Sequence, residues 1–490
     1  MKKEKLIAIL TASGLAVSLT ACGSTSGTST TSASASTSTT TASSTTASST
    51  AGTTSASSSD TSSDSSETYS LGSAADSSAT AYENSEDDGH AILADGEDAE
   101  YDNITVTKTG SSASSEEADF YGYNAAVLAQ NGATLTITNA DITTSGSHAN
   151  AVFAYGEGTT VNISDSTIYT TDNNSGGLMT TGGATMNATN LTVVTEGGSS
   201  AAIRSDRGGG TVNVTGGYYE SNGSGSPAIY STADVYVTGA TLVSNAAQGV
   251  VVEGSNSVTL TDTDLTADNT VKNSDNSDTY QAVMLYQSMS GDASTGTSSF
   301  TMTGGTLTSE NGGMFFVTNT DAEIQLENVE LTYATDDLLR IEAAGWGTDG
   351  SNGGNVTFTA IDQDLEGIIT VDDISTLNYY LTDGSSYEGA INTDGEAGDV
   401  YVELDGDSTW TLTGDSYITS LTCDADSIDL NGYTLYVNGV EYTEGTASSG
   451  SAVEAAERSS SGSGSGSGSA MGVSGSAGGS ALAKPGSSNS

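Results

Sequence analysis

The sequence predicts an all-β protein, namely a single-stranded right-handed parallel β-helix of roughly a dozen coils with disordered Ser/Thr-rich and Gly/Ser-rich tails. A short segment of alternating apolar and polar residues recurs along the middle of the chain, mostly at a spacing of about 23–26 residues. Each copy closes with Asn, Asp or Gly, the residue types that turn a chain most readily. Although a hydrophobic fraction of only 35% is compatible with disorder, this periodicity argues for a folded body.

The repeated unit has two apolar residues two positions apart between polar neighbours, which is the pattern of a strand with one buried face. The eight copies are 134–139, 160–165, 185–190, 211–216, 234–239, 257–262, 299–304 and 323–328. Another apolar or aromatic residue stands three positions after each copy: Ile142, Ile168, Val193, Tyr219, Leu242, Leu265, Leu307 and Leu331. Because a single coil cannot bury its apolar edge alone, successive coils must stack.

Irregular spacings predict where loops and ends lie. Between Asp262 and Gly304 the repeat is lengthened by polar residues at 269–279 and 288–297. A Gly-rich loop is expected at Gly345–Gly350. Asn438-Gly439, between two short apolar runs, predicts a tight hairpin that caps the open end of the β-helix and protects its edge strand.

A second strand precedes each repeat and has two adjacent columns of side chains. The first column is apolar and is predicted to face inward: Val127, Val152, Leu178, Ile203, Ile229, Val251, Met284, Phe315 and Leu339. The next position alternates to the outside and reads Leu128, Phe153, Met179, Arg204, Tyr230, Val252, Leu285, Phe316 and Arg340. An exposed stripe of this kind predicts a binding surface. Two alternatives stay open: the strand bends so that both columns point inward, or a loop covers the stripe.

Within this stripe, the candidate ligand-binding residues combine aromatic and basic side chains. They are Phe153, Arg204, Asp206, Arg207, Tyr230, Phe316 and Arg340. Asp206 and Arg207 belong because Arg204–Gly210 places two Arg and one Asp before three Gly, which would let a ligand approach the backbone. The alternative for this cluster is a local ion pair beside a tight Gly turn.

No cofactor is expected, because the sequence has no zinc, phosphate-loop or dinucleotide motif. Asp336-Asp337 and Asp372-Asp373 are compatible with Ca²⁺, which takes six to eight oxygen ligands. Solvated turn acids are the other interpretation of these pairs. Only His90 and His148 could partner a catalytic Cys423, and neither is near it in sequence, so we expect Cys423 to be a buried, inert thiol.

The net charge of the chain limits the kinds of partner that the protein can bind. The chain has 62 acidic and 10 basic residues, a formal net charge of −52. Such a surface repels phosphates, so nucleic acid is excluded as a partner. Divalent cations and cationic partners are favoured instead.

The first residues resemble a bacterial lipoprotein signal peptide. Lys2, Lys3 and Lys5 precede an apolar stretch at 6–19 that is too short for a membrane span, and Leu19-Thr20-Ala21-Cys22 matches a lipobox. An ordinary secretory signal is the alternative. The resemblance implies that residues 1–21 are removed, that Cys22 carries lipid, and that the protein is anchored in the membrane on the outer surface of the cell.

Composition divides the rest of the chain into three zones. Residues 22–66 comprise Cys22 and a Ser/Thr-rich tether, in which nothing can form a core. Residues 67–445 form the predicted β-helix, and residues 446–490 a Gly/Ser-rich disordered tail.

The repeats at 120–445 resemble the pectin-lyase-like β-helix superfamily, and most of all its adhesin-like bacterial surface proteins. That resemblance implies adhesion, or binding of a carbohydrate or host ligand, as the function; a Ca²⁺-dependent polysaccharide lyase or a glycoside hydrolase is the alternative, and a spacer without a ligand a second one. Asn392-Thr393-Asp394-Gly395 matches one polygalacturonase motif, but the Asp pair, Gly-His-Gly and Arg-Ile-Lys motifs expected after it are missing. We therefore expect a glycan or a ligand on a host or neighbouring cell as the partner, and no catalytic residues.

Overall fold

The computed structural model describes residues 72–272, 276–277, 279–395 and 398–456. All of them belong to the second of two compact units, Tyr69–Ser490. The predicted signal peptide, the lipidated Cys22, the tether and the tail from residue 457 onward lie outside the described residues. Within these ranges, no helix has the length and hydropathy needed to cross a membrane.

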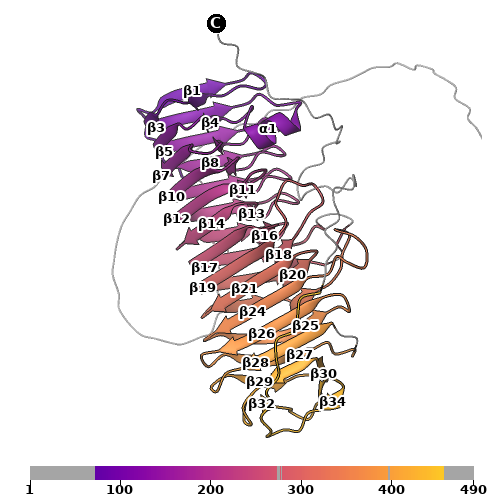
Figure 1. Cartoon of the computed structure of the whole chain (residues 1–490). Coiled ribbons are helices and arrows are strands. Elements are labelled where there is room, and N and C mark those ends of the chain that lie inside the picture. Colours follow the sequence, from indigo (N-terminus) through magenta and orange to yellow (C-terminus); the bar gives the residue numbers. More distant parts are fainter. Residues whose placement is uncertain (1–71, 273–275, 278, 396–397, 457–490) are drawn as a thin grey trace, which may run out of the picture. The chain divides into compact units, whose positions relative to one another are not determined.

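The described residues form stacked coils of parallel strands (Figure 1), as the sequence repeat predicts. One face, called face 1, is a 14-stranded sheet. Its strands are β2 (Ile92–Asp95), β4 (Val127–Gln130), β6 (Val152–Tyr155), β9 (Leu178–Thr181), β11 (Ile203–Ser205), β13 (Ile229–Ser231), β16 (Val250–Glu253), β18 (Gln281–Tyr286), β20 (Gly313–Thr318), β23 (Asp337–Ile341), β25 (Asp364–Val371), β27 (Ser386–Ile391), β29 (Thr409–Leu412) and β32 (Ile428–Asp429).

The other two faces belong to one 17-stranded sheet that bends in each repeat up to β22. Its strands are β1 (Thr80–Asn84), β3 (Ala99–Lys108), β5 (Thr134–Thr144), β7 (Thr160–Ser164), β8 (Thr167–Thr170), β10 (Ala184–Thr195), β12 (Gly210–Ser221), β14 (Asp234–Thr238), β15 (Thr241–Ser244), β17 (Ser257–Asp268), β19 (Thr297–Asn311), β21 (Asp321–Glu327), β22 (Glu330–Tyr333), β24 (Asn355–Ile361), β26 (Thr376–Thr382), β28 (Asp399–Leu404) and β31 (Ser420–Thr422). We call the part before the bend face 2 and the part after it face 3.

The bend lies at the closing residue of each repeat. All eight closing residues have positive φ, between 46° and 65°, as expected for Asn, Asp and Gly in the left-handed region. Coils pair in register across this bend; for example, Thr185 pairs with Thr211 on face 2 and Thr192 with Tyr218 on face 3. The predicted fold class, a parallel β-helix, is therefore confirmed.

The interior is one continuous column of apolar side chains drawn from all three faces. Residues two apart on a strand point inward together, as Val161 and Ile163 do on β7, where both are buried. Phe300, Phe315 and Phe358 continue this column with ring centroids 5.8–5.9 Å apart. Stacking of successive coils thus supplies the core that a single coil lacks.

The cross-section changes after β22. Face 3 ends there, because β24 leads through Asp362 and Gln363 directly into β25 on face 1. The spacing between paired strands falls accordingly, from 26 residues between Ala184 and Gly210 to 21 between Asn355 and Thr376. The described coils beyond this point have two faces instead of three.

The C-terminal end matches the predicted hairpin. A small sheet contains β30 (Ser416–Ile418), β33 (Leu435–Val437) and β34 (Val440–Glu441), and β33 and β34 are antiparallel. Asn438 and Gly439 both have positive φ, which is the geometry of a tight two-residue turn.

The chain then runs back along the β-helix as far as it is described. Ser448 pairs with Cys423 through backbone hydrogen bonds, Val453 bonds to the side chain of Asn378, and Ala456 bonds to the side chain of Asn355. The first residues of the predicted tail therefore contact the body. Cys423 is a free, buried thiol, as expected, and its burial raises the pKa of the thiol.

Candidate functional site

The predicted binding stripe lies on the outer side of face 1, but it is not exposed. Phe153, Arg204, Tyr230 and Phe316 each expose 3% of their surface or less, and Asp206 exposes 2%. The expectation of an open apolar stripe is therefore wrong, and the alternative that other segments cover it is confirmed. We call this column the covered seam.

The register of the seam also differs from the prediction in two coils. Tyr230 pairs with Val251, and Val251 with Met284, so these two residues continue the outer column. Val252 and Leu285 point into the core, where the sequence pattern had placed Val251 and Met284. The predicted columns are therefore exchanged in these two strands, whose residues are buried on both sides of the sheet.

The only helix in the described ranges, α1 (Ser115–Tyr121), covers the N-terminal part of the seam (Figure 1). The helix ends at Gly122, whose φ is 74°. A Cβ at this position would lie 2.8 Å from Leu128 and 2.9 Å from Phe153, so only Gly lets the chain cross the seam this closely. The cover continues with Trp346, which packs against Tyr286 with ring centroids 5.2 Å apart.

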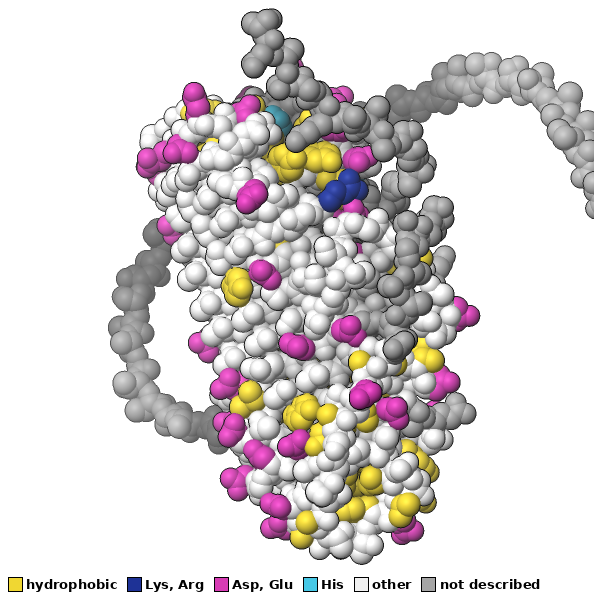
Figure 2. All heavy atoms as spheres, viewed as in Figure 1, with side chains coloured by type: hydrophobic (Ala, Val, Ile, Leu, Met, Phe, Trp, Pro, Cys, Tyr) yellow, Lys and Arg dark blue, Asp and Glu magenta, His cyan; other side chains and the backbone are white. Residues whose placement is uncertain are grey.

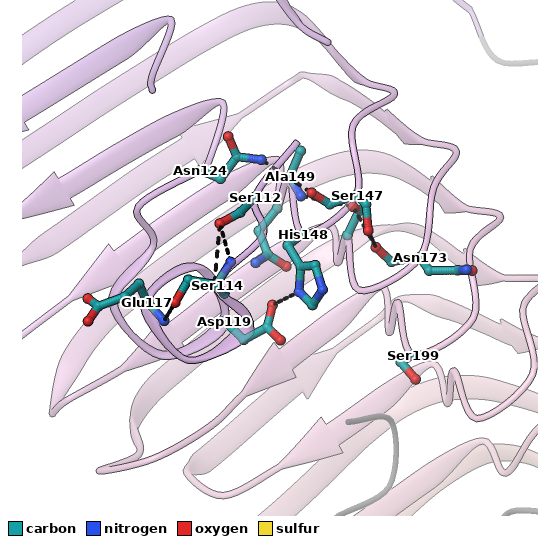
Figure 3. A network of polar contacts seen from close by, with 12 residues as sticks. Ser112, Ser114, Glu117, Asp119, Asn124, Ser147, His148, Ala149, Asn173 and Ser199 are labelled. Carbon is teal, nitrogen blue, oxygen red and sulfur yellow. Dashed lines mark hydrogen bonds and ion pairs between the residues drawn. The ribbon is translucent and has the colours of Figure 1, made fainter. Parts of the chain in front are cut away.

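Polar contacts hold α1 in place (Figure 3). Ser114 caps the helix by accepting a hydrogen bond from the Glu117 N–H. Nδ1 of His148, which lies in the turn before β6, is 2.8 Å from Oδ1 of the buried Asp119 on α1. Oδ2 of Asp119 has no hydrogen-bond partner among the described residues.

This Asp–His pair does not form a serine triad with Ser199. His148 aligns with Asn174 of the next coil, and Asn174 aligns with Ser199 of the coil after that, as successive backbone hydrogen bonds show. Because strands of one sheet are about 4.8 Å apart, two coils separate these side chains by roughly 10 Å. Figure 3 shows Ser199 well away from the imidazole of His148. The pair therefore positions the helix.

The Arg204–Arg207 cluster has two separate roles in the structure. Arg204 is buried and donates from Nη2 to Oδ2 of Asp206 at 2.9 Å, and burial raises the pKa of Asp206. Arg207 is partly exposed and donates to Asp292 at 2.8 Å and to Glu116 of α1 at 3.1 Å. The predicted local ion pair is thus present. Arg207 links α1 to the segment between β18 and β19, which contains Asp292 and is the other part of the cover.

Glu253 is a buried acid beneath the cover with a raised pKa. It is fully buried on β16, and it accepts hydrogen bonds from the hydroxyls of Tyr230, Tyr286 and Ser288. Burial outweighs these hydrogen bonds and raises its pKa to about 7. Ser288 belongs to the segment between β18 and β19, so Glu253 ties that segment to the seam.

The remaining candidate residues have structural partners. Arg340 is half-buried and pairs with Glu342 at 2.9 Å and with Asp337 at 3.6 Å. Asp372 accepts the backbone N–H of Ile374 two residues on, as a turn acid does, and that of Ala343 from another part of the chain. Asn392 of the polygalacturonase-like tetrapeptide is buried and accepts the N–H of Val371. No group of three or more metal-ligating side chains is found in the described part of the chain.

A groove of about 650 Å³ that the sequence pattern did not predict opens where face 3 ends. One wall is β22, with Glu330, Leu331 and Tyr333. The opposite wall is the segment Asp362–Glu366 that leads into β25. The described residues that line the groove include four acidic side chains and no Lys or Arg.

Side-chain hydrogen bonds connect the two walls of the groove. At one end the amide of Gln363 accepts the Val329 N–H at 2.7 Å and donates to the Val329 carbonyl at 2.8 Å. At the other end the hydroxyl of Tyr333 donates to the carbonyl of Glu366. The sequence signal for this groove was the shortened repeat after Ile361, which removes one strand from the next coil.

The exposed surface agrees with the acidic composition. Figure 2 shows acidic side chains distributed over the visible face of the coils, with very few basic ones. Four basic side chains in the described ranges are already engaged: Arg204, Arg207 and Arg340 pair with acids, and Lys108 is buried and donates to the carbonyl of Glu86.

No protein-family model matches the chain, and no curated protein and no solved structure is significantly similar to it. The fold and the candidate sites define the class: a parallel β-helix with a covered seam on one face and an acidic groove at the end of another.

Proposed function

We propose that this protein is a lipid-anchored surface protein of a bacterial cell that binds a ligand on another surface through its β-helix. The ligand is a glycan or a protein of a host or neighbouring cell. The resemblance of residues 1–22 to a lipoprotein signal peptide supports the anchor on Cys22. The Ser/Thr-rich segment after it would extend the β-helix away from the membrane.

The acidic groove between β22 and Asp362–Glu366 is the observation that supports a binding function best. Binding sites are concave and combine apolar and polar groups, and the groove offers Leu331 and Tyr333 beside exposed carboxylates. The covered seam supports it less, because its aromatic side chains are buried. A catalytic role has no comparable support, since Asp119 and His148 hold a helix.

An array experiment tests the proposal. The chain from residue 23 onward would be applied to plant glycans, mucin glycans and matrix proteins, with and without Ca²⁺. The double variant Asp364→Asn/Glu366→Gln removes two exposed groove charges, and Glu97→Gln/Glu157→Gln removes two exposed charges elsewhere. We expect a selective hit that weakens about tenfold in the groove variant only. A blank array with folded protein would contradict binding and favour a spacer.

The anchor is tested separately. Cys22→Ser should abolish incorporation of a labelled fatty acid and release the protein from the membrane fraction into the medium, because no other lipidation site is expected. Retention of the variant in the membrane fraction would contradict lipidation at Cys22.

A further inference from the structure

The last strand of face 3 has a free edge. β22 pairs with β19 on one side, with Thr306 opposite Glu330 and Ser309 opposite Tyr333. On its other side no strand of the described residues pairs with it, because Asp364–Glu366 of the next coil belong to β25 and pair with β27 instead. The groove separates this edge from the segment Asp362–Glu366 of the next coil, which does not pair with it.

The hydrogen bonds of Val329 show which backbone groups point to this edge. Its N–H and C=O both bond to the Gln363 side chain, so they point toward the groove. Backbone groups alternate between the two edges of a strand, so Leu331 and Tyr333 direct their N–H and C=O to the same side. Among the described residues, the Gln363 side chain is the only group that hydrogen-bonds to the backbone along this edge of the strand. It bonds only to Val329.

The acidic charge of the groove indicates which kind of peptide strand could bind there. Glu330, Asp362, Asp364 and Glu366 are exposed and line the groove, and its described lining has no basic side chain to neutralise them. An acidic or neutral segment would gain nothing from these carboxylates, whereas Lys and Arg would form charge-assisted hydrogen bonds with them.

We propose that the free edge of β22 binds an extended segment of a partner protein, with Lys or Arg at alternate positions, as an added strand. This inference rests on the proposed binding function and names the class of ligand. The backbone of the segment bonds to Leu331 and Tyr333, and its basic side chains meet the groove acids. β22 has four residues, which span about 13 Å, so the groove accommodates roughly four residues of the partner.

Exposed acids are also a device by which proteins keep free strand edges from pairing with one another. That explanation needs no ligand. It predicts that no peptide binds to the edge, so the same experiment distinguishes it from the proposal.

Three labelled peptides test the inference with the chain from residue 23 onward. The first alternates Lys and Val over eight residues with blocked ends. The second has the same side chains but N-methylated alternate backbone nitrogens, which removes strand donors without changing charge. The third replaces every Lys by Glu. Fluorescence anisotropy at low and high salt would report binding.

We expect the Lys-Val peptide to bind, the N-methylated peptide to bind at least tenfold more weakly, and the Glu-Val peptide not to bind. Asp364→Asn/Glu366→Gln should weaken Lys-Val binding about tenfold, and Glu97→Gln/Glu157→Gln should leave it unchanged. Hydrogen exchange in 329–333 should slow at least tenfold with the peptide bound.

Equal binding of the N-methylated peptide would overturn the inference, because charge attraction alone would then explain it. An array hit without Lys-Val binding would overturn the inference and leave the proposed function standing. Absence of both would overturn both.

Discussion

Glu253 illustrates how a buried acid can hold a surface segment. Its carboxyl group is surrounded by the hydroxyls of Tyr230, Tyr286 and Ser288, and Asp206 is near enough to disfavour a second negative charge. Burial is the largest effect and, together with Asp206, favours the protonated acid. It outweighs the hydroxyl hydrogen bonds, which favour the carboxylate, so the pKa of Glu253 is raised from 4.5 to about 7. Asp292, on the same covering segment, instead pairs with Arg207.

This raised pKa predicts the pH dependence of the cover. Stability from protonated Glu253 is fully present below about pH 4.5 and is lost as pH rises through about 7, a loss on the order of 3 kcal/mol. Hydrogen exchange in 281–296, corrected for its intrinsic pH dependence, should therefore accelerate between pH 5 and 8. Glu253→Gln cannot ionise, so we expect this acceleration to disappear. The same acceleration in the variant would show that another group is responsible.

Arg207 joins the two parts of the cover. Its guanidinium bonds to Glu116 on α1 and to Asp292, and its Cζ lies 3.9 Å from the centre of the Phe120 ring. Because the side chain is 39% exposed, these contacts contribute modestly.

Arg207→Ala should lower the local stability of the cover by about 1–2 kcal/mol and speed proteolytic cleavage in 287–296. Arg340→Ala is the matched control, since Arg340 pairs with Asp337 and Glu342 instead. Equal cleavage rates in both variants would show that Arg207 does not join the cover.

At the scale of the element, the bend between faces 2 and 3 depends on one residue per coil. Asn190 has a φ of 52°, and its amide donates to Asp165 of the preceding coil at 2.7 Å. A β-branched residue is strained in this conformation, whereas Gly adopts it freely.

Asn190→Val should therefore lower the free energy of unfolding by about 1–2 kcal/mol, and Asn190→Gly should change it by less than half as much. Urea denaturation followed by circular dichroism gives both values. If Gly were as destabilising as Val, the Asp165 hydrogen bond, and not the backbone conformation, would dominate.

At three places an Asn or Gln side-chain amide hydrogen-bonds to a backbone N–H and C=O, as the backbone of a neighbouring strand would. Gln363 bonds to both backbone groups of Val329, Asn378 to both of Val453, and Asn355 to both of Ala456. Each amide offers one donor and one acceptor at the spacing of a peptide group, so it can satisfy one residue of an unpaired chain.

The segment 446–456 should detach when two of these amides are removed. Asn355→Ala/Asn378→Ala is expected to increase hydrogen exchange at Val453 and Ala456 at least tenfold, because their N–H groups lose their acceptors. Asn187→Ala/Asn213→Ala, in an amide ladder on face 2, is the control and should leave this segment protected. Unchanged exchange in the first variant would contradict the assigned contacts.

At the scale of the whole molecule, the net charge of −52 opposes folding, because the compact state brings like charges together. Screening by salt weakens this repulsion, with a Debye length of about 30 Å at 0.01 M and about 10 Å at 0.1 M. We expect the melting temperature to rise by several degrees over this range. A constant or falling melting temperature would indicate that local ion pairs outweigh the general repulsion.

The sequence by itself determined the β-helix, the bends and the C-terminal turn. These features depend on short-range chemistry: alternation buries one side of a strand, Asn, Asp and Gly adopt positive φ, and Asn438-Gly439 forms a two-residue turn. Because the same short sequence pattern recurs in successive coils, they fold in the same way, and the stacking of coils follows from a single repeat.

Only the tertiary structure decided what lies against each face. The cover over Phe153 and Tyr230 comes from α1 and from residues beyond β18, which lie one or more coils away along the chain from these two residues. It also buries both sides of β16, so alternation no longer distinguishes Val251 from Val252. The groove arises because one coil omits a strand that its neighbour retains, and the consequence of that omission depends on how two coils meet in space.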